Sequence, residues 1–216
     1  MSKTTLRHIV VEGPIGAGKT TLARRLADTF NAELVLEAAD ENPFLERFYQ
    51  DPRHAALPTQ LFFLFQRARQ LQAMRQADLF APVRVADFLM DKDPLFAELT
   101  LEPDELRLYE QVYEQLTLEL PAPDLVIYLQ APVEVLQTRI AKRGRPAERG
   151  IGADYLLRVV EAYARFFYHF DKAPLLIVNA AEIDLSSGEH DYQQLLAQVQ
   201  SMRSGRHFFN PLPIGL

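Results

Sequence analysis

The sequence predicts an α/β fold in which a parallel sheet carries helices on both faces. Short apolar segments of strand length alternate along the chain with amphipathic segments of helix length, an order typical of parallel strands joined by helical crossovers. A glycine-rich loop also joins the first such strand to the first helix. With 216 residues, of which 48% are hydrophobic, the chain can bury one substantial core. We therefore expect a single three-layer domain over residues 1–204, followed by a tail at residues 205–216.

The glycine-rich loop is the most specific feature of the chain. Residues 13–20, GPIGAGKT, match the pattern G-x-x-x-x-G-K-[ST] between a buried strand at residues 6–11 and a helix at residues 21–30. In such loops, backbone N–H groups and the helix N-terminus bind phosphate oxygens, the lysine reaches the β- and γ-phosphates, and the hydroxyl binds Mg²⁺. The sequence thus predicts a P-loop nucleoside-triphosphate site. Its candidate residues are Gly13, Gly16, Ala17, Gly18, Lys19, Thr20 and Thr21.

The alternation continues along the rest of the chain. Further segments with the length and apolar content of buried strands are residues 32–37, 83–86, 125–129 and 175–178. Segments with helical spacing of apolar residues are about 43–48, 58–78, 94–99, 104–120, 132–142, 153–170 and 191–202. We expect a five-stranded parallel sheet from this order. The segment from Gly205, with Pro211 and Pro213, is expected to be an arm or a disordered end.

Two carboxylates follow neighbouring strands in this scheme. Glu37 ends the second expected strand, and Asp87 ends the third. In open parallel sheets, ligands bind at the carboxyl ends of the strands, where the glycine-rich loop also lies. Two carboxylates and a phosphate-binding loop on one edge suit chemistry on a γ-phosphate.

A basic segment at residues 139–145 offers a second set of phosphate ligands. Arg139 and Arg143 are four residues apart and therefore lie on one helical face. The guanidinium fork suits phosphate oxygens as charge builds up during transfer. A solvated basic helix end, favoured by the helix dipole, is the alternative interpretation.

Composition excludes several classes of function. The net charge of −6 argues against a broad nucleic-acid-binding face. The chain has no cysteine, which excludes disulfides, zinc–thiolate sites and a cysteine nucleophile, and its five histidines show no metal-ligand spacing. No apolar run approaches the roughly 18 residues of a membrane span, and the N-terminus lacks an apolar signal core. We expect a soluble, cytoplasmic protein without a membrane or nucleic-acid partner.

The ordered set of motifs resembles the deoxynucleoside kinase family, with the bacterial deoxyadenosine, deoxycytidine and deoxyguanosine kinases as the nearest type. The residues that carry the resemblance are the P-loop, Glu37, Gln60 and Arg67 on one long helix, and the basic segment. The resemblance spans nearly all of the chain up to about residue 200. It implies a P-loop kinase that uses ATP and Mg²⁺ to phosphorylate the 5′-hydroxyl of a deoxynucleoside in salvage. It also implies a homodimer that pairs the helices at residues 58–78 and 104–120.

The resemblance further implies the roles of the catalytic residues. Glu37 corresponds to the general base, which agrees with its place at the strand end. Asp87 corresponds to the first residue of an Asp/Glu-Arg-Ser motif and would hold Mg²⁺ together with Thr20. Phe88 and Leu89 stand where that motif has Arg and Ser. The task of the arginine then falls to Lys19, the basic segment or Lys92.

Substrate contacts follow from the same resemblance. A lid at about residues 139–150 would place Arg139, Arg143 and Arg145 on the phosphates and Glu148 on the sugar 3′-hydroxyl. Tyr49 corresponds to a sugar contact, and Gln60, Arg67 and Asp93 to the residues that bind the base. Gln60 and Arg67 are two helical turns apart and face the same way. Candidate stacking residues, or plain core, are Phe44, Phe63 and Phe88, and residues 179–185 would lie near the adenine of ATP.

Three other interpretations compete with this one. A nucleoside-monophosphate kinase of the thymidylate type also has a P-loop and a lid, but Glu37 would repel the acceptor phosphate. A regulatory P-loop ATPase leaves Gln60, Arg67 and Asp93 without a role, and the guanine-binding N-K-x-D pattern of GTPases is absent. A catalytically inactive binding module is the third, since the arginine after Asp87 is missing.

Overall fold

The computed structural model describes residues 6–75, 83–117, 122–186 and 188–211. In these residues, six parallel strands form one sheet in the order β2-β3-β1-β4-β5-β6. The strands are β1 (His8–Glu12), β2 (Glu33–Val35), β3 (Arg84–Ala86), β4 (Leu125–Gln130), β5 (Leu175–Asn179) and β6 (Arg206–Phe209). The predicted α/β fold with a parallel sheet is confirmed, with one more strand than expected.

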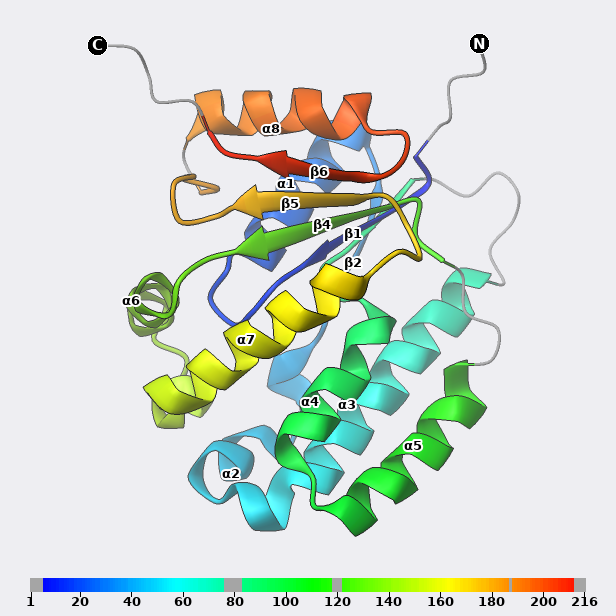
Figure 1. Cartoon of the computed structure of the whole chain (residues 1–216), viewed down its shortest axis with the longest axis vertical. Coiled ribbons are helices and arrows are strands. Elements are labelled where there is room, and N and C mark those ends of the chain that lie inside the picture. Colours follow the sequence, from blue (N-terminus) through cyan, green and yellow to red (C-terminus); the bar gives the residue numbers. More distant parts are fainter. Residues whose placement is uncertain (1–5, 76–82, 118–121, 187, 212–216) are drawn as a thin grey trace.

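Helices lie on both faces of the sheet and produce three layers. The α-helices are α1 (Lys19–Phe30), α2 (Leu45–Gln50), α3 (Pro52–Arg75), α4 (Asp93–Thr100), α5 (Pro103–Thr117), α6 (Val133–Arg143), α7 (Ala153–His169) and α8 (Glu189–Ser201). Short 3₁₀ turns are η1 (Ala39–Glu41), η2 (Met90–Lys92) and η3 (Pro146–Gly150). One core cluster joins the sheet to α1, α6 and α8, and the other joins it to α3, α4, α5 and α7. Figure 1 shows this second group of helices gathered on one side of the sheet.

The central strands are apolar because both of their faces are covered. Every residue of β1 is buried, and β4 is buried except at its last residue. A strand between two helical layers has no solvent face, so its sequence is continuously apolar instead of alternating. β1 pairs with β3 on one side and β4 on the other, which places its carboxyl end at the middle of the sheet edge.

Two predicted boundaries, the start of the long helix and the end of the second strand, were wrong. The long helix α3 begins at Pro52 and contains Pro58 in its interior, whereas the sequence pattern predicted a start at Pro58. Both prolines suit a first helical turn, and burial of Ala55 and Ala56 favours the earlier start. β2 ends at Val35, so Glu37 lies two residues beyond the strand. The predicted ends of the two long helices, residues 76–78 and 118–120, lie outside the described residues.

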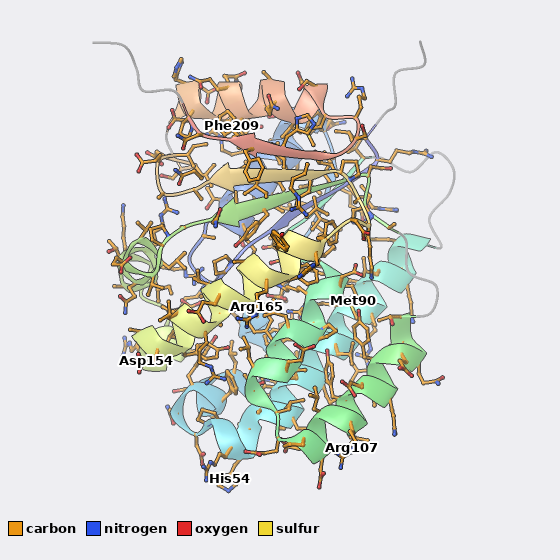
Figure 2. All side chains as sticks on the ribbon, viewed as in Figure 1. His54, Met90, Arg107, Asp154, Arg165 and Phe209 are labelled. Atoms are coloured by element: carbon orange, nitrogen blue, oxygen red, sulfur yellow. The ribbon has the colours of Figure 1, made fainter. Side chains whose placement is uncertain are left out.

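The expected tail is partly a strand. Residues 206–209 pair with β5, and Phe209 packs beside α8 against the core (Figure 2). The Arg206 guanidinium donates hydrogen bonds to the carbonyl oxygens of Phe167 and Tyr168, each at 2.9 Å, at the end of α7. The segment RHFF shows no apolar alternation because it forms an edge strand that is mostly exposed. Pattern analysis of the sequence therefore missed it.

No helix among the described residues is both long and apolar enough to cross a membrane.

Candidate active site

The P-loop wraps from β1 into α1 at the centre of the sheet edge. Gly16 and Gly18 have φ angles of 86° and 102°, which side-chain-bearing residues rarely adopt, and a Cβ on Gly16 would lie 2.9 Å from a backbone oxygen. Lys19 folds back over the loop, and its Nζ donates to the carbonyl oxygens of Gly13 at 2.7 Å and Pro14 at 3.3 Å. No side chain caps the N-terminus of α1, and its first turn carries no acidic residue. The loop can therefore accept an anion.

Two cavities meet at this loop. The inner cavity, about 330 Å³, lies between the P-loop, α2, α3 and η3. The outer cavity, about 820 Å³, lies between the P-loop, α6 and residues 181–186. Both are lined by Gly16 and Arg143. A ligand in one cavity therefore meets a ligand in the other at the P-loop.

The structure divides the predicted site residues between these cavities. Those that line the inner cavity are Gly16, Lys19, Thr20, Glu37, Tyr49, Gln60, Arg67, Asp87, Arg143, Arg145 and Glu148. Those that line the outer cavity are Gly16, Ala17, Gly18, Thr21, Arg139 and Arg143. Gly13 and Asp93 line neither, and Asp93 instead forms an ion pair with Arg67 behind the inner cavity wall.

Asp87 connects the P-loop helix to the segment after β2. Its Oδ2 accepts a hydrogen bond from the Thr20 hydroxyl at 2.5 Å, and its Oδ1 accepts one from the backbone N–H of Glu37 at 2.7 Å. Burial raises the pKa of Asp87. A hydroxyl and a carboxylate side by side are the oxygen ligands that Mg²⁺ uses when phosphates complete its coordination. The described residues contain no cluster of three His, Cys, Asp or Glu side chains that could hold a metal alone.

Glu37 is bound by the guanidinium of Arg67. Arg67 Nε donates to Glu37 Oε1 at 2.7 Å, Nη2 contacts the same oxygen, and Nη1 pairs with Asp93. Burial alone would raise the pKa of Glu37, but the charges of Arg67, Lys92 and Lys19 outweigh it and lower that pKa to about 2. The carboxylate is therefore ionised at neutral pH.

The basic segment separates into two parts. Arg143, the last residue of α6, forms a bidentate pair with Glu148 at 2.7 Å and lines both cavities. Arg139 donates to the carbonyl oxygen of Ala180 at 2.7 Å and lines the outer cavity only. The two arginines lie on one face of α6, as predicted, and both line the outer cavity, but only Arg143, which pairs with Glu148, also lines the inner cavity.

Aromatic residues of the inner cavity differ from those proposed from the sequence. Phe63 lines the cavity with the Arg67 guanidinium 5.0 Å from its ring. Phe88 is buried in the core, and Phe44 is not among the lining residues. Aromatic residues that the sequence analysis missed are Phe48, Phe96, Tyr155 and Tyr163. They come from helices that only the fold brings together.

The expected adenine segment lines the outer cavity in part. Residues 181–185 lie on its wall together with Ser186. Asn179 does not, because its side chain contacts Asn210 at 2.8 Å and the backbone N–H of Ala181 at 3.2 Å.

Glu12 is the main site residue that the sequence analysis missed. It is fully buried at the end of β1 and accepts hydrogen bonds from the backbone N–H groups of Gly13 at 2.8 Å and Leu89 at 2.7 Å. Its Oε1 also accepts from Lys92 Nζ at 3.2 Å and from the Tyr163 hydroxyl at 2.9 Å. A charged residue that ends an apolar strand just before the P-loop is the sequence signal that could have identified it.

Comparison with known proteins agrees with this geometry. A family model described as deoxynucleoside kinase matches residues 9–203. Deoxyguanosine kinase of Bacillus subtilis is 35% identical over 204 residues, which cover 92% of this chain and 98% of that protein. The deoxyadenosine/deoxycytidine kinase of the same organism is 27% identical, over 90% and 92% of the two chains. A deoxyadenosine kinase from M. mycoides with bound dATP has a TM-score of 0.78 at 26% identity, over 90% and 100% of the chains.

The ion pairs of Glu37 predict a pH-dependent contribution to stability. The pKa of Glu37 falls from 4.5 to about 2 on folding, so the charged form stabilises the fold above about pH 5 and this contribution is lost as the pH falls toward 2. Glu37→Gln imitates the protonated form. We expect the variant to have the lower free energy of unfolding at pH 7, with the difference shrinking at pH 4 and pH 3. Urea denaturation at each pH measures this difference, and a gap that does not change with pH would contradict the ion pairing.

Proposed function

This chain belongs to the deoxynucleoside kinase family, and from that premise we propose how its site performs phosphoryl transfer to a deoxynucleoside in nucleotide salvage. The proposal is that Mg-ATP donates the γ-phosphoryl group and that the 5′-hydroxyl of the deoxynucleoside in the inner cavity accepts it. The observation that carries it is that an ionised carboxylate, Glu37, and the P-loop lysine, Lys19, line the same cavity. Glu37 would take a proton from the acceptor hydroxyl, and Lys19 would neutralise charge on the transferred phosphate.

On the acceptor side, Glu37 serves as the general base. Its position between the P-loop and the cavity suits a 5′-hydroxyl that points at the γ-phosphate. Tyr49 and Glu148 contact the sugar in this proposal, since both line the inner cavity. Gln60 and Arg67 bind the base from two turns of α3, and Asp93 supports Arg67 from behind.

On the donor side, the P-loop and Arg139 bind ATP in the outer cavity, with its adenine near residues 181–186. Thr20 and Asp87 hold Mg²⁺, which would supply charge neutralisation on the phosphates. Arg143 lines both cavities and Arg145 lines the inner one, and in this proposal both move onto the phosphates when the lid at residues 139–150 closes. Both arginines form ion pairs with Glu148, which they would exchange for phosphate oxygens.

A nucleoside-monophosphate kinase is not favoured. Its acceptor carries a phosphate, whereas the inner cavity presents the ionised carboxylate of Glu37 at the position where that phosphate would lie. A regulatory ATPase is not favoured either, because it has no use for a second cavity lined by Gln60 and Arg67.

The polarity of the base-binding residues favours some nucleobases over others. In this proposal the base reaches past Arg67 to Asp93, which lies behind the cavity wall. Asp93 is 1% exposed, and its Oδ2 is buried without a hydrogen-bond partner, as is the hydroxyl oxygen of Thr59 on the wall. A carboxylate can only accept hydrogen bonds, and adenine and cytosine offer an amino donor on the edge that faces Gln60. Thymine offers a carbonyl oxygen there. Guanine presents O6 and N7 to the Arg67 fork, so this argument leaves deoxyguanosine open.

We also propose a cytoplasmic homodimer. Two large apolar side chains, Phe65 on α3 and Leu108 on α5, are 41% and 49% exposed on neighbouring helices. Exposed large apolar residues on adjoining helices are typical of an interface, and a two-fold axis would pair these helices between subunits.

The role of Glu37 predicts a selective loss of turnover. Glu37→Gln keeps the shape of the side chain but removes the base, so kcat should fall by about 10²-fold or more while Mg-ATP still binds. Glu46→Gln, the same change at an exposed position on α2, should leave kcat unchanged. Steady-state kinetics and ATP titration measure the two effects. Near-full turnover in Glu37→Gln would show that another group is the base.

The hydrogen-bonding polarity of the proposed base-binding residues predicts which deoxynucleosides are phosphorylated most efficiently. Purified protein with Mg-ATP and a panel of the four deoxynucleosides, adenosine and dTMP should phosphorylate deoxyadenosine or deoxycytidine well. Thymidine should have a kcat/KM about ten- to a hundred-fold lower, since an unpaired buried polar group costs about 1–3 kcal/mol. Arg67→Met combined with Asp93→Ala should narrow that gap. Equal kcat/KM for thymidine and deoxyadenosine would reject the pocket assignment, and product formed only from dTMP would reject the proposed function.

The proposed homodimer should have a mass in solution of twice the chain mass of 24.7 kDa. Leu108→Glu should shift the protein to the monomer, because it places charges on the two-fold interface. Leu157 on α7 is equally exposed, at 48%, so Leu157→Glu is the matched control and should remain dimeric. Light scattering at micromolar concentration gives the mass. A monomeric parent protein would refute the dimer.

A further inference from the structure

Lys92 is a buried ammonium group in the wall of the inner cavity. It ends η2, the turn that follows β3, and is only 2% exposed, yet it lines the cavity beside Glu37. Its Nζ lies 3.2 Å from both carboxylate oxygens of Glu12 and 3.9 Å from Glu37 Oε1. The ring of Phe96 lies under the ammonium at 5.7 Å. The ammonium group therefore has Glu12, Glu37 and the ring of Phe96 as neighbours, and it borders the inner cavity.

A purely structural role does not account for this placement. Glu12 alone would neutralise a buried lysine, and a buried ion pair stabilises a fold no better than apolar residues of the same volume. Packing requires neither that the ammonium reach a second carboxylate, Glu37, nor that it open onto a cavity. Both features are expected of a cation that meets a ligand.

A second ammonium group faces the same space. Lys19 and Lys92 both line the inner cavity, and burial together with the positive charge of Lys92 lowers the pKa of Lys19. The carboxylates of Glu12 and Glu37 offset part of the repulsion between the two ammonium groups, and an anion bound between these groups would be attracted by both. The transferred phosphoryl group is the anion that passes through this space in the proposed reaction.

We propose that Lys92 is a catalytic residue that contacts the transferred phosphoryl group from the acceptor side, opposite Lys19. This inference rests on the proposed function. As the 5′-oxygen forms its bond to the γ-phosphorus, the bond from that phosphorus to the β–γ bridging oxygen breaks, the hydroxyl proton passes to Glu37 and ADP leaves. Lys92 exchanges no proton. Its fixed charge stabilises the negative charge that builds on the phosphoryl oxygens, and Glu12 keeps it in place.

The test separates transition-state stabilisation from binding and folding. In Lys92→Met, kcat should fall by about 10²-fold or more, while the dissociation constant of Mg-ATP and the KM of the nucleoside change less than threefold. Lys92→Arg, which keeps the charge, should recover at least a tenth of the parent kcat. Lys172→Met, the same change at an exposed lysine, should match the parent.

An equilibrium measurement provides a second readout. Aluminium fluoride with Mg-ADP and the preferred deoxynucleoside imitates the transferring phosphoryl group. Calorimetry should show that Lys92→Met loses the gain in affinity that aluminium fluoride gives the parent protein, whereas Mg-ADP alone binds both equally. If Lys92→Met does not fold, Lys92→Gln, which removes the charge but can still donate a hydrogen bond to Glu12, is measured in its place, with the same expectation.

Two results would overturn the inference. One is a kcat for the charge-removed variant within threefold of the parent. The other is an equal loss of affinity for Mg-ADP with and without aluminium fluoride, which would assign Lys92 to structure alone. Both presuppose an active parent protein. A parent that phosphorylates no deoxynucleoside rejects the proposed function itself, and the assignment of Lys92 fails with it.

Discussion

The buried carboxylate of Glu12 is the interaction on which the rest of the site depends. It ends the central strand, and its two oxygens accept hydrogen bonds from the first residue of the P-loop, from the segment after β3, from Lys92 and from α7. An ionised group without water is costly unless its lone pairs are satisfied, and here four donors satisfy them. One carboxylate thereby fixes the P-loop, the turn that carries Lys92 and α7, which lines the inner cavity, relative to one another.

The charges around Glu12 form a closely balanced set. Its cations are Lys19, Arg67 and Lys92, and its anions are Glu12, Glu37, Asp87 and Asp93. Such a set is weak as a source of stability, because desolvation cancels much of the attraction. Its value is functional. In the proposed reaction, the contacts among these groups would hold them in position before substrate arrives, so little reorganisation would be needed as charge moves from the acceptor to the leaving group.

Arg67 contacts Glu37, the proposed general base, and also lines the proposed nucleobase site. Its guanidinium contacts Glu37 and Asp93 together, and it lines the cavity in which the nucleobase would lie. In the proposed reaction, a nucleobase that draws this guanidinium toward itself would weaken its hold on Glu37, whose carboxylate would then accept the hydroxyl proton more readily. The shared arginine would thereby couple the choice of nucleobase to the chemistry at the sugar, through one side chain of α3.

The sequence by itself determined the α/β class, the P-loop and the edge on which Glu37 and Asp87 meet it. Those features follow from local periodicity and from the rule that parallel strands present their carboxyl ends together. Only the tertiary structure decided three other features: the four-residue strand β6, the start of α3 at Pro52 and the aromatic residues of the inner cavity. It also decided the position of Arg143 on both cavities, whereas Arg139 lines the outer cavity only. These depend on contacts between residues far apart in the chain, such as Glu12 with Lys92 and Tyr163, and no local pattern encodes those contacts.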